Sequence, residues 1–262
     1  MATQTADIVE TVSIGRILSR TGAVLAANPV TMFGIAFVFG AIPAVLISWF
    51  QVSLRTSILD RYQQMGVIAV AIVAGIVSMI FYALVQGALV RATIAHTEGQ
   101  RASFGESAAA GLAVALPLIG LSILAALGIW LGLILLIVPG IMLFCMWAVV
   151  APALVEERTG VFGAFGRSRE LTKGARWKVF GLELILLVAM WIVTAVFGLL
   201  ILGTVNAEAM AQNAVSVGWI VGSAVLNTLI YTVWGTVQTS LYVELRNWKE
   251  GPSGKALEDI FA

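Results

Sequence analysis

The chain has 262 residues, of which 60% are hydrophobic and 11% charged, with a formal net charge of +1. A soluble domain carries about 25% charged residues, so lipid must be the solvent for much of this surface. The near-neutral charge argues against nucleic acid as a partner. The single Cys145 and the single His96 argue against a disulfide within the chain and against a metal site, so we expect no metal and no cofactor.

Residues 1–29 are expected to form a cytoplasmic amphipathic segment. Apolar positions between Asp7 and Asn28 recur at helical spacing, and Asn28-Pro29 breaks the chain before the first apolar run. A cleavable signal peptide is not expected, because that run starts near Val30 and ends in the bulky pair Trp49-Phe50.

Six transmembrane helices are predicted, because about 20 apolar residues cross the hydrocarbon core as a helix. The predicted spans are 30–50, 66–90, 111–137, 141–155, 179–202 and 217–242. The third and fourth come from one stretch without Asp, Glu, Lys or Arg, from Ser107 to Val155, in which Pro139-Gly140 is expected to supply a tight turn. A re-entrant pair in place of these two spans is the alternative. Pro43 and Pro117 are expected to kink spans one and three.

The placement of charge predicts the orientation. With the N-terminus inside, only Arg55 and Arg61 of the 15 lysines and arginines lie outside. Such a bias follows the positive-inside rule and places both termini in the cytoplasm. The transmembrane domain then covers residues 30–242, and residues 243–262 form a cytoplasmic tail.

The spans are expected to form three hairpins, each preceded by a cytoplasmic helix that lies in the headgroup plane. Besides the N-terminal segment, the candidates are segments near 92–110 and 160–173, in which apolar and charged residues are mixed. Ordinary charged loops are the alternative.

The run from Leu136 to Trp177 resembles the YciC-like family of uncharacterised bacterial inner-membrane proteins. It is also similar to the membrane domain attached to some glycerophosphodiester phosphodiesterases. A further matching element is Gly99-Gln100-Arg101. The residues that carry the resemblance are Val138, Pro139, Gly140, Ile141, Pro152, Glu156, Glu157, Arg167, Ser168, Leu171 and Thr172.

This resemblance implies a polytopic protein of the bacterial inner membrane, and it implies no established activity. The chain contains no soluble phosphodiesterase domain and no set of metal-binding carboxylates and histidines, so that activity is not carried over.

Glu183 is the only carboxylate well inside a predicted span, which makes it a candidate ion or proton site. The alternative is that span five starts later and Glu183 reaches the headgroups. Span six adds polar residues that could face protein or a transport pathway. The polar residues predicted within spans are Gln86, Thr194, Asn227, Thr228, Thr232, Thr236, Gln238 and Thr239.

A basic cluster follows span four and is expected to contact lipid headgroups or a partner, since basic groups near the membrane attract anionic lipid. Its members are Arg158, Arg167, Arg169, Lys173, Arg176 and Lys178. The alternative is that the cluster only keeps this loop inside. Arg167 and Lys173 are expected to form local ion pairs with Glu170 between them.

Together these features predict a non-enzymatic integral inner-membrane protein that acts through lipid contacts, including anionic lipids, or through association with other membrane proteins or itself. Its role would be that of a scaffold, an assembly factor or a component of envelope homeostasis. The alternative is a small transporter or channel that uses Glu183 and the polar residues of span six. A membrane-embedded lipid enzyme is disfavoured, because Glu183 has no evident second acid, base or nucleophile.

Overall fold

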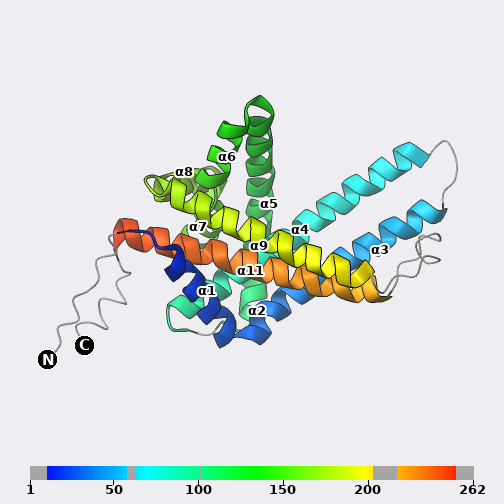
Figure 1. Cartoon of the computed structure of the whole chain (residues 1–262), viewed down its shortest axis with the longest axis horizontal. Coiled ribbons are helices and arrows are strands. Elements are labelled where there is room, and N and C mark those ends of the chain that lie inside the picture. The colour runs from blue at the N-terminus through cyan, green and yellow to red at the C-terminus, as the bar shows by residue number, and fades with distance from the viewer. Residues whose placement is uncertain (1–10, 58–62, 101, 203–216, 252–262) are drawn as a thin grey trace.

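A computed structural model describes residues 11–57, 63–100, 102–202 and 217–251 as helices joined by turns, with no strand among them (Figure 1). The elements are α1 (Ile14–Ala27), α2 (Pro29–Ala36), η1 (Phe37–Ala41), α3 (Ile42–Ser57), α4 (Gln63–Thr97), α5 (Phe104–Leu135), α6 (Ile137–Met146), α7 (Val150–Glu157), α8 (Gly160–Thr172), α9 (Arg176–Leu202) and α11 (Val217–Glu250).

Six helical stretches are long and apolar enough to cross a membrane, which makes this a multi-pass membrane protein. They are Pro29–Phe50, Ile68–Thr97, Phe104–Leu135, Ile137–Glu157, Arg176–Leu200 and Gly218–Glu250. The predicted number of membrane-length apolar helices and their places along the chain are therefore confirmed. Several helices extend past the predicted ends, because a helix does not stop where its apolar stretch stops.

The first span contains a π-helical turn, η1, placed directly before Pro43. The N–H of Ile42 donates to the carbonyl oxygen of Phe37. Proline has no N–H for the helical ladder, and its ring crowds the preceding turn. The sequence predicted a kink at Pro43, and the widened turn is the form in which the helix accommodates it.

The break between spans three and four lies at Leu136 and not at Pro139-Gly140, so the predicted position of the turn was wrong. Leu136 has an extended backbone (φ −160°, ψ 139°), and α6 begins at Ile137. Pro139 lies in the first turn of α6, where a missing N–H costs no hydrogen bond. Gly140 is buried against α5 instead.

Small residues let α5 and the start of the fourth span pack closely. A Cβ atom on Gly132 would lie 2.9 Å from the Cα atom of Gly140, and one on Gly128 would lie 2.6 Å from the indole of Trp147. Both contacts lie within one chain. They hold the two helices as an antiparallel hairpin.

The hairpins share one end of the molecule and diverge at the other (Figure 1). The α5–α6 hairpin points away from the α3–α4 hairpin, while α9 and α11 lie side by side. Helix α11 contacts α1, α4 and α9, so it forms the centre of the fold. Many large apolar side chains on the diverging helices stay exposed, among them Leu116, Trp191 and Leu199. Lipid is the environment that suits such a surface.

The structure agrees with the three expected interfacial helices to different degrees. Helix α1 forms, but its buried residues Ile17, Thr21 and Val24 pack on the protein; residues 7–10 of the expected helix lie outside the described part. The segment near 92–110 is no separate helix, because α4 runs to Thr97 and α5 begins at Phe104. Helix α8 (Gly160–Thr172) covers the segment 160–173 except for Lys173, which follows its end.

The expected tail, residues 243–262, begins inside a helix. Helix α11 continues to Glu250, and Glu244 and Leu245 are buried. Residues 252–262 lie outside the described part of the chain, as do Arg61 and Arg101.

Candidate functional site

Several of the residues that carry the family resemblance lie where the fourth span is broken, among them Ser168 and Thr172. Helix α6 ends at Met146 and α7 starts at Val150. The carbonyl oxygen of Met146 therefore lacks the hydrogen bond that a continuous helix would give it. Ser168 and Thr172 of α8 donate their hydroxyls to this oxygen at 2.9 and 3.3 Å. A broken helix at membrane depth is tolerated when neighbouring side chains satisfy its freed backbone groups. These two residues therefore hold the break.

The acidic pair of the motif ties α7 and α8 to the end of α11. Arg167 donates through Nε to Glu157 Oε1 at 2.7 Å and pairs through Nη2 with Glu250. The hydroxyl of Tyr242 donates to the same oxygen of Glu157 at 2.8 Å. Burial alone would lower the pKa of Arg167, but its hydrogen bonds to Glu157 and Glu250 outweigh this and raise the pKa. Arg167 is thus engaged inside the protein.

Three further motif residues contribute to this junction. Pro152 and Leu171 are buried, and Glu156 lies 3.6 Å from Arg246 across the same junction. The expected ion pairing of Arg167 and Lys173 through Glu170 is not what the structure contains: Arg167 pairs with Glu157 and Glu250.

The predicted basic cluster is divided by the fold. Arg158, Arg169 and Lys173 are exposed. Lys178 donates from Nζ to the carbonyl oxygen of Val12 at 2.9 Å and so secures the N-terminal segment. The cluster is therefore partly a set of internal contacts and partly a free basic surface.

Arg176 lies in a groove between α6 and α9 with a volume of about 450 Å³. The other lining residues are apolar or aromatic: Val138, Ile141, Met142, Cys145, Trp177 and Phe180. The guanidinium has one weak contact, from Nη2 to the sulfur of Met146 at 3.7 Å. Its Nε is buried and has no hydrogen-bond partner among the described residues. The groove thus joins an apolar wall to an incompletely paired cation.

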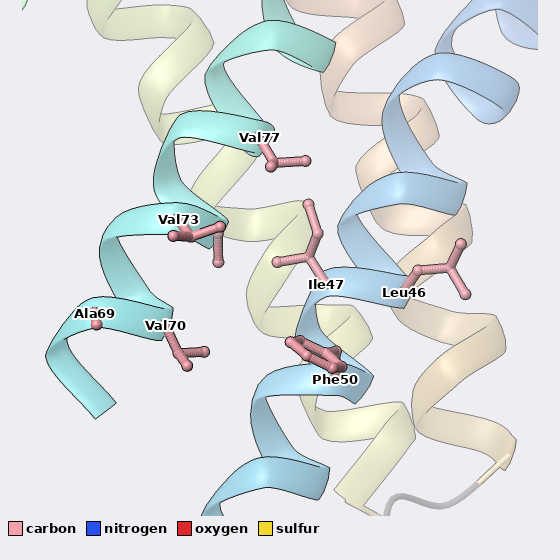
Figure 2. Close-up of a pocket in the computed structure, with 8 residues that line it drawn as sticks. Leu46, Ile47, Phe50, Ala69, Val70, Val73 and Val77 are labelled. Carbon is pink, nitrogen blue, oxygen red and sulfur yellow. The ribbon is translucent and has the colours of Figure 1, made fainter. Parts of the chain in front are cut away.

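A second groove lies between α3 and α4, and its lining is wholly apolar (Figure 2). It has a volume of about 420 Å³, and Figure 2 shows Ile47, Phe50 and Val73 at its walls. A groove with this chemistry suits hydrocarbon.

Glu183 lies inside the helix bundle, so the alternative in which it reaches the headgroups was wrong. Its side chain is 3% exposed, and Gln238 of α11 donates from Nε2 to its Oε1 at 2.8 Å. Its second oxygen, Oε2, is buried and has no partner in the described part of the chain. The pairing joins α9 to α11 across 55 positions of sequence.

Gln86 of α4 and Gln238 of α11 both line a cavity of about 270 Å³. Gln86 donates from Nε2 to the hydroxyl oxygen of Tyr82 at 2.8 Å. The lining of this cavity is mostly apolar, and Gln238 connects it to Glu183, to which it donates.

The other polar residues of span six are mostly directed inward, but their hydroxyls are used within the helix. Thr228, Thr232, Thr236 and Thr239 are buried, and each donates to the carbonyl oxygen four residues earlier. Asn227 likewise donates to Ser223, and Thr194 of α9 is exposed. The threonines alone therefore form no polar pathway.

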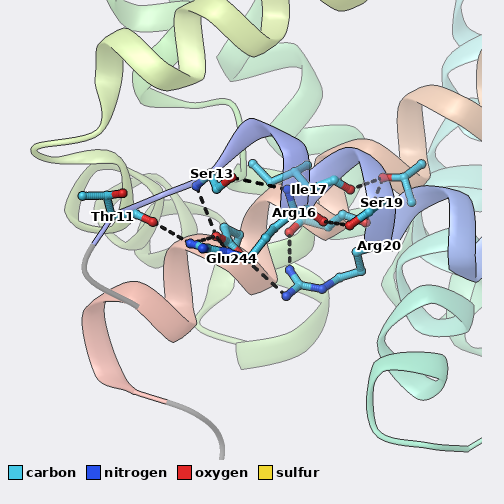
Figure 3. A network of polar contacts seen from close by, with 9 residues as sticks. Thr11, Ser13, Arg16, Ile17, Ser19, Arg20 and Glu244 are labelled. Carbon is cyan, nitrogen blue, oxygen red and sulfur yellow. Dashed lines mark hydrogen bonds and ion pairs between the residues drawn. The ribbon is translucent and has the colours of Figure 1, made fainter. Parts of the chain in front are cut away.

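Glu244 is a buried charged residue that the sequence analysis missed. Figure 3 shows it beneath α1, where Arg16 Nη2 lies 2.7 Å from Oε1 and Arg20 Nη2 lies 3.4 Å from Oε2. The N–H of Ser13 adds a hydrogen bond of 3.3 Å to Oε1. The sequence signal for its burial was that Glu244 stands among apolar residues within a helical stretch. We call Arg16, Arg20 and Glu244 the N-terminal clamp.

Comparisons with protein-family models, with curated proteins and with solved structures gave no match. The resemblance described above therefore stands on the quoted residues alone. The described residues also contain no group of three or more His, Cys, Asp and Glu side chains placed to hold a metal ion.

Proposed function

We propose that this chain is a non-enzymatic, multi-pass protein of the bacterial inner membrane that binds phospholipid in the groove between α6 and α9. An acyl chain would lie along the apolar wall, and the headgroup phosphate would contact Arg176. Both termini would face the cytoplasm, in keeping with the distribution of lysine and arginine.

The observation that carries this proposal is the guanidinium of Arg176 above an otherwise apolar groove. A guanidinium presents its donors in a planar fork that matches phosphate oxygens, and such bonds are stronger than those between neutral groups. Among the described residues no carboxylate forms a salt bridge with Arg176. A lipid phosphate would supply the missing partner.

Two further features support lipid as the ligand. Trp177, which is 86% exposed, follows Arg176 directly, and tryptophan is enriched at the level of the headgroups. Arg169 and Lys173 are exposed on the preceding segment. Basic groups near a membrane surface add about 1 kcal/mol each to the attraction for anionic lipid. The role would be that of a lipid-dependent scaffold or assembly factor, or one in envelope homeostasis.

The test is native mass spectrometry of the delipidated full-length protein after addition of phosphatidylglycerol. We expect Arg176→Gln to lower the occupancy of the first bound lipid at least threefold. Arg169→Gln is the matched control, because it removes an exposed charge outside the groove and should change occupancy little. Equal loss in both variants would mean that the attraction is diffuse, and no loss in Arg176→Gln would refute the site.

A small transporter is the second candidate, and the burial of Glu183 next to a cavity between the spans favours it. An ionisable group at this depth is a functional candidate by default. Saturable uptake of a substrate into proteoliposomes would support this role over lipid binding alone.

A further inference from the structure

The groove between α6 and α9 carries a positive charge where a lipid headgroup would lie. Arg176 is half-buried at the first position of α9, and within the described ranges no other residue that lines the groove is charged. The groove is open along one side, so a lipid can enter it from the surrounding membrane. A headgroup in the groove therefore lies against a guanidinium.

The carboxylates of the neighbouring helices do not offset this charge at the groove. Helix α6 contains no Asp or Glu. On α9 the carboxylate is Glu183, which is 3% exposed and accepts a hydrogen bond from Gln238 of α11. On α8 the carboxylate is Glu170, which is exposed and forms no salt bridge with Arg176 in the described part of the chain. A cationic group in the groove would therefore find no anionic partner there.

The segment that leads into α9 adds further positive charge. Arg169, Lys173 and Lys178 are exposed, and Glu170 is the only acidic residue between Arg169 and Lys178. The start of a helix also carries a partial positive charge from its free N–H groups. The surroundings of Arg176 therefore attract an anion and repel a second cation.

Phospholipid headgroups differ in the groups that they carry beyond the phosphate. Phosphatidylethanolamine has an ammonium close to its phosphate, whereas phosphatidylglycerol has neutral hydroxyls in its place. A guanidinium binds the phosphate of either lipid. A charge that leaves water without an opposite partner costs free energy, whereas a hydroxyl at the water surface costs little. The ammonium, and not the phosphate, therefore distinguishes the two lipids at this groove.

We propose that the groove selects anionic phospholipids whose headgroup lacks an ammonium; this selection depends on the lipid site proposed above. The phosphate accepts hydrogen bonds from the guanidinium of Arg176, and the neutral hydroxyls remain in water. The ammonium of a zwitterionic lipid is repelled by Arg176 and by the exposed basic residues around it. An acyl chain contacts the same apolar wall in both cases, so the difference comes from the headgroup alone.

The test is competition between two lipids for the delipidated full-length protein in detergent, measured by native mass spectrometry. Phosphatidylglycerol and phosphatidylethanolamine with identical acyl chains are added in equal amounts, and the ratio of the two singly bound species is recorded. We expect at least fivefold more bound phosphatidylglycerol. Arg176→Gln should bring the two species close to equality, and Arg176→Lys, which keeps the charge, should retain the preference.

A second variant keeps the test decisive if Arg176→Gln does not fold. Lys173→Glu reverses an exposed charge three residues before Arg176 and should lower the preference for phosphatidylglycerol at least twofold. Arg158→Glu is the matched control, because it makes the same change at an exposed position before the other end of α8. It should leave the preference as in the wild type.

The outcomes separate the headgroup selection from the lipid site itself. Equal binding of both lipids, lost for both in Arg176→Gln, would overturn the selection and leave the lipid site in place, whereas binding of neither lipid would overturn both proposals. An unchanged preference in the folded Arg176→Gln and Lys173→Glu variants would also overturn the selection. Glycerophosphoglycerol, the headgroup without acyl chains, should not displace phosphatidylglycerol at equal concentration; displacement would show a site for free phosphodiesters and overturn the proposal.

Discussion

At the scale of single residues, Glu244 shows how a buried charge organises a segment far away in sequence. Its side chain is 2% exposed, and it forms ion pairs with two arginines of α1, which starts more than 200 positions earlier. Arg16 and Arg20 remain 47% and 24% exposed, so water still solvates them. The carboxylate is therefore the member of the clamp whose loss costs most, because it alone is fully desolvated.

We predict that Glu244→Gln loosens α1 from α11. Hydrogen bonds to charged groups contribute about 1.5–3 kcal/mol, and this substitution weakens the contacts of one carboxylate with Arg16, Arg20 and Ser13. Hydrogen exchange should rise at least tenfold in residues 14–27 and stay unchanged in α5. Glu170→Gln, on the exposed side of α8, should leave exchange in α1 as it is. Unaltered exchange in Glu244→Gln would show that apolar packing alone holds α1.

At the scale of elements, α4 and α5 touch backbone to backbone through two glycines. A Cβ atom on Gly111 would lie 2.6 Å from the carbonyl oxygen of Leu84, and one on Gly87 would lie 2.9 Å from the Cα atom of Gly111. A neighbouring backbone cannot move aside as the end of a side chain can. The approach of the two helices therefore depends on these two glycines.

Gly111→Ala is expected to destabilise the protein by about 1–3 kcal/mol, the usual cost of overpacking. The measurement is the thermal unfolding midpoint in detergent, which should fall by several degrees. Gly120→Ala on the same helix is the control, because its Cβ would meet its nearest neighbour at 4.0 Å. That variant should be neutral or slightly stabilising, since alanine favours a helix over glycine. A similar midpoint for both variants would contradict the close approach.

At the scale of the whole molecule, the diverging hairpins place the grooves and the cavity between them. One groove lies between the arms of the α3–α4 hairpin, and another lies between α6 and α9, which belong to different hairpins. The cavity of about 270 Å³ is lined by residues of α4, α5, α6, α7 and α11. A bundle of parallel, tightly packed helices would leave no such spaces. The arrangement of the hairpins thus creates the candidate sites.

The six-span orientation predicts which residues face each aqueous side. In a Cys145→Ala background, Glu98→Cys between α4 and α5 should react with an impermeant maleimide only after the membrane is opened. Leu136→Cys at the tip of the α5–α6 hairpin should react in intact spheroplasts. Protection of Leu136→Cys in both conditions would favour the re-entrant pair and contradict six crossings.

The candidate site was predictable in part. Glu183 and the basic cluster stood out because charge is rare in this chain. Their partners did not, since Gln238 and Tyr242 lie 55 and 85 positions from Glu183 and Glu157. Arg167 pairs within the protein, whereas Arg176 faces a groove. The residues next to each arginine in the sequence do not reveal this difference.

The sequence by itself determined that the chain is helical, multi-pass and built from six apolar stretches. The reason is that crossing a bilayer depends on the length and polarity of one continuous segment, which are local properties. Only the tertiary structure decided the pairing of Glu183 with Gln238, the N-terminal clamp and the break at Leu136. These depend on how each helix is rotated against its neighbours, and that rotation is set by the packing of all the helices together.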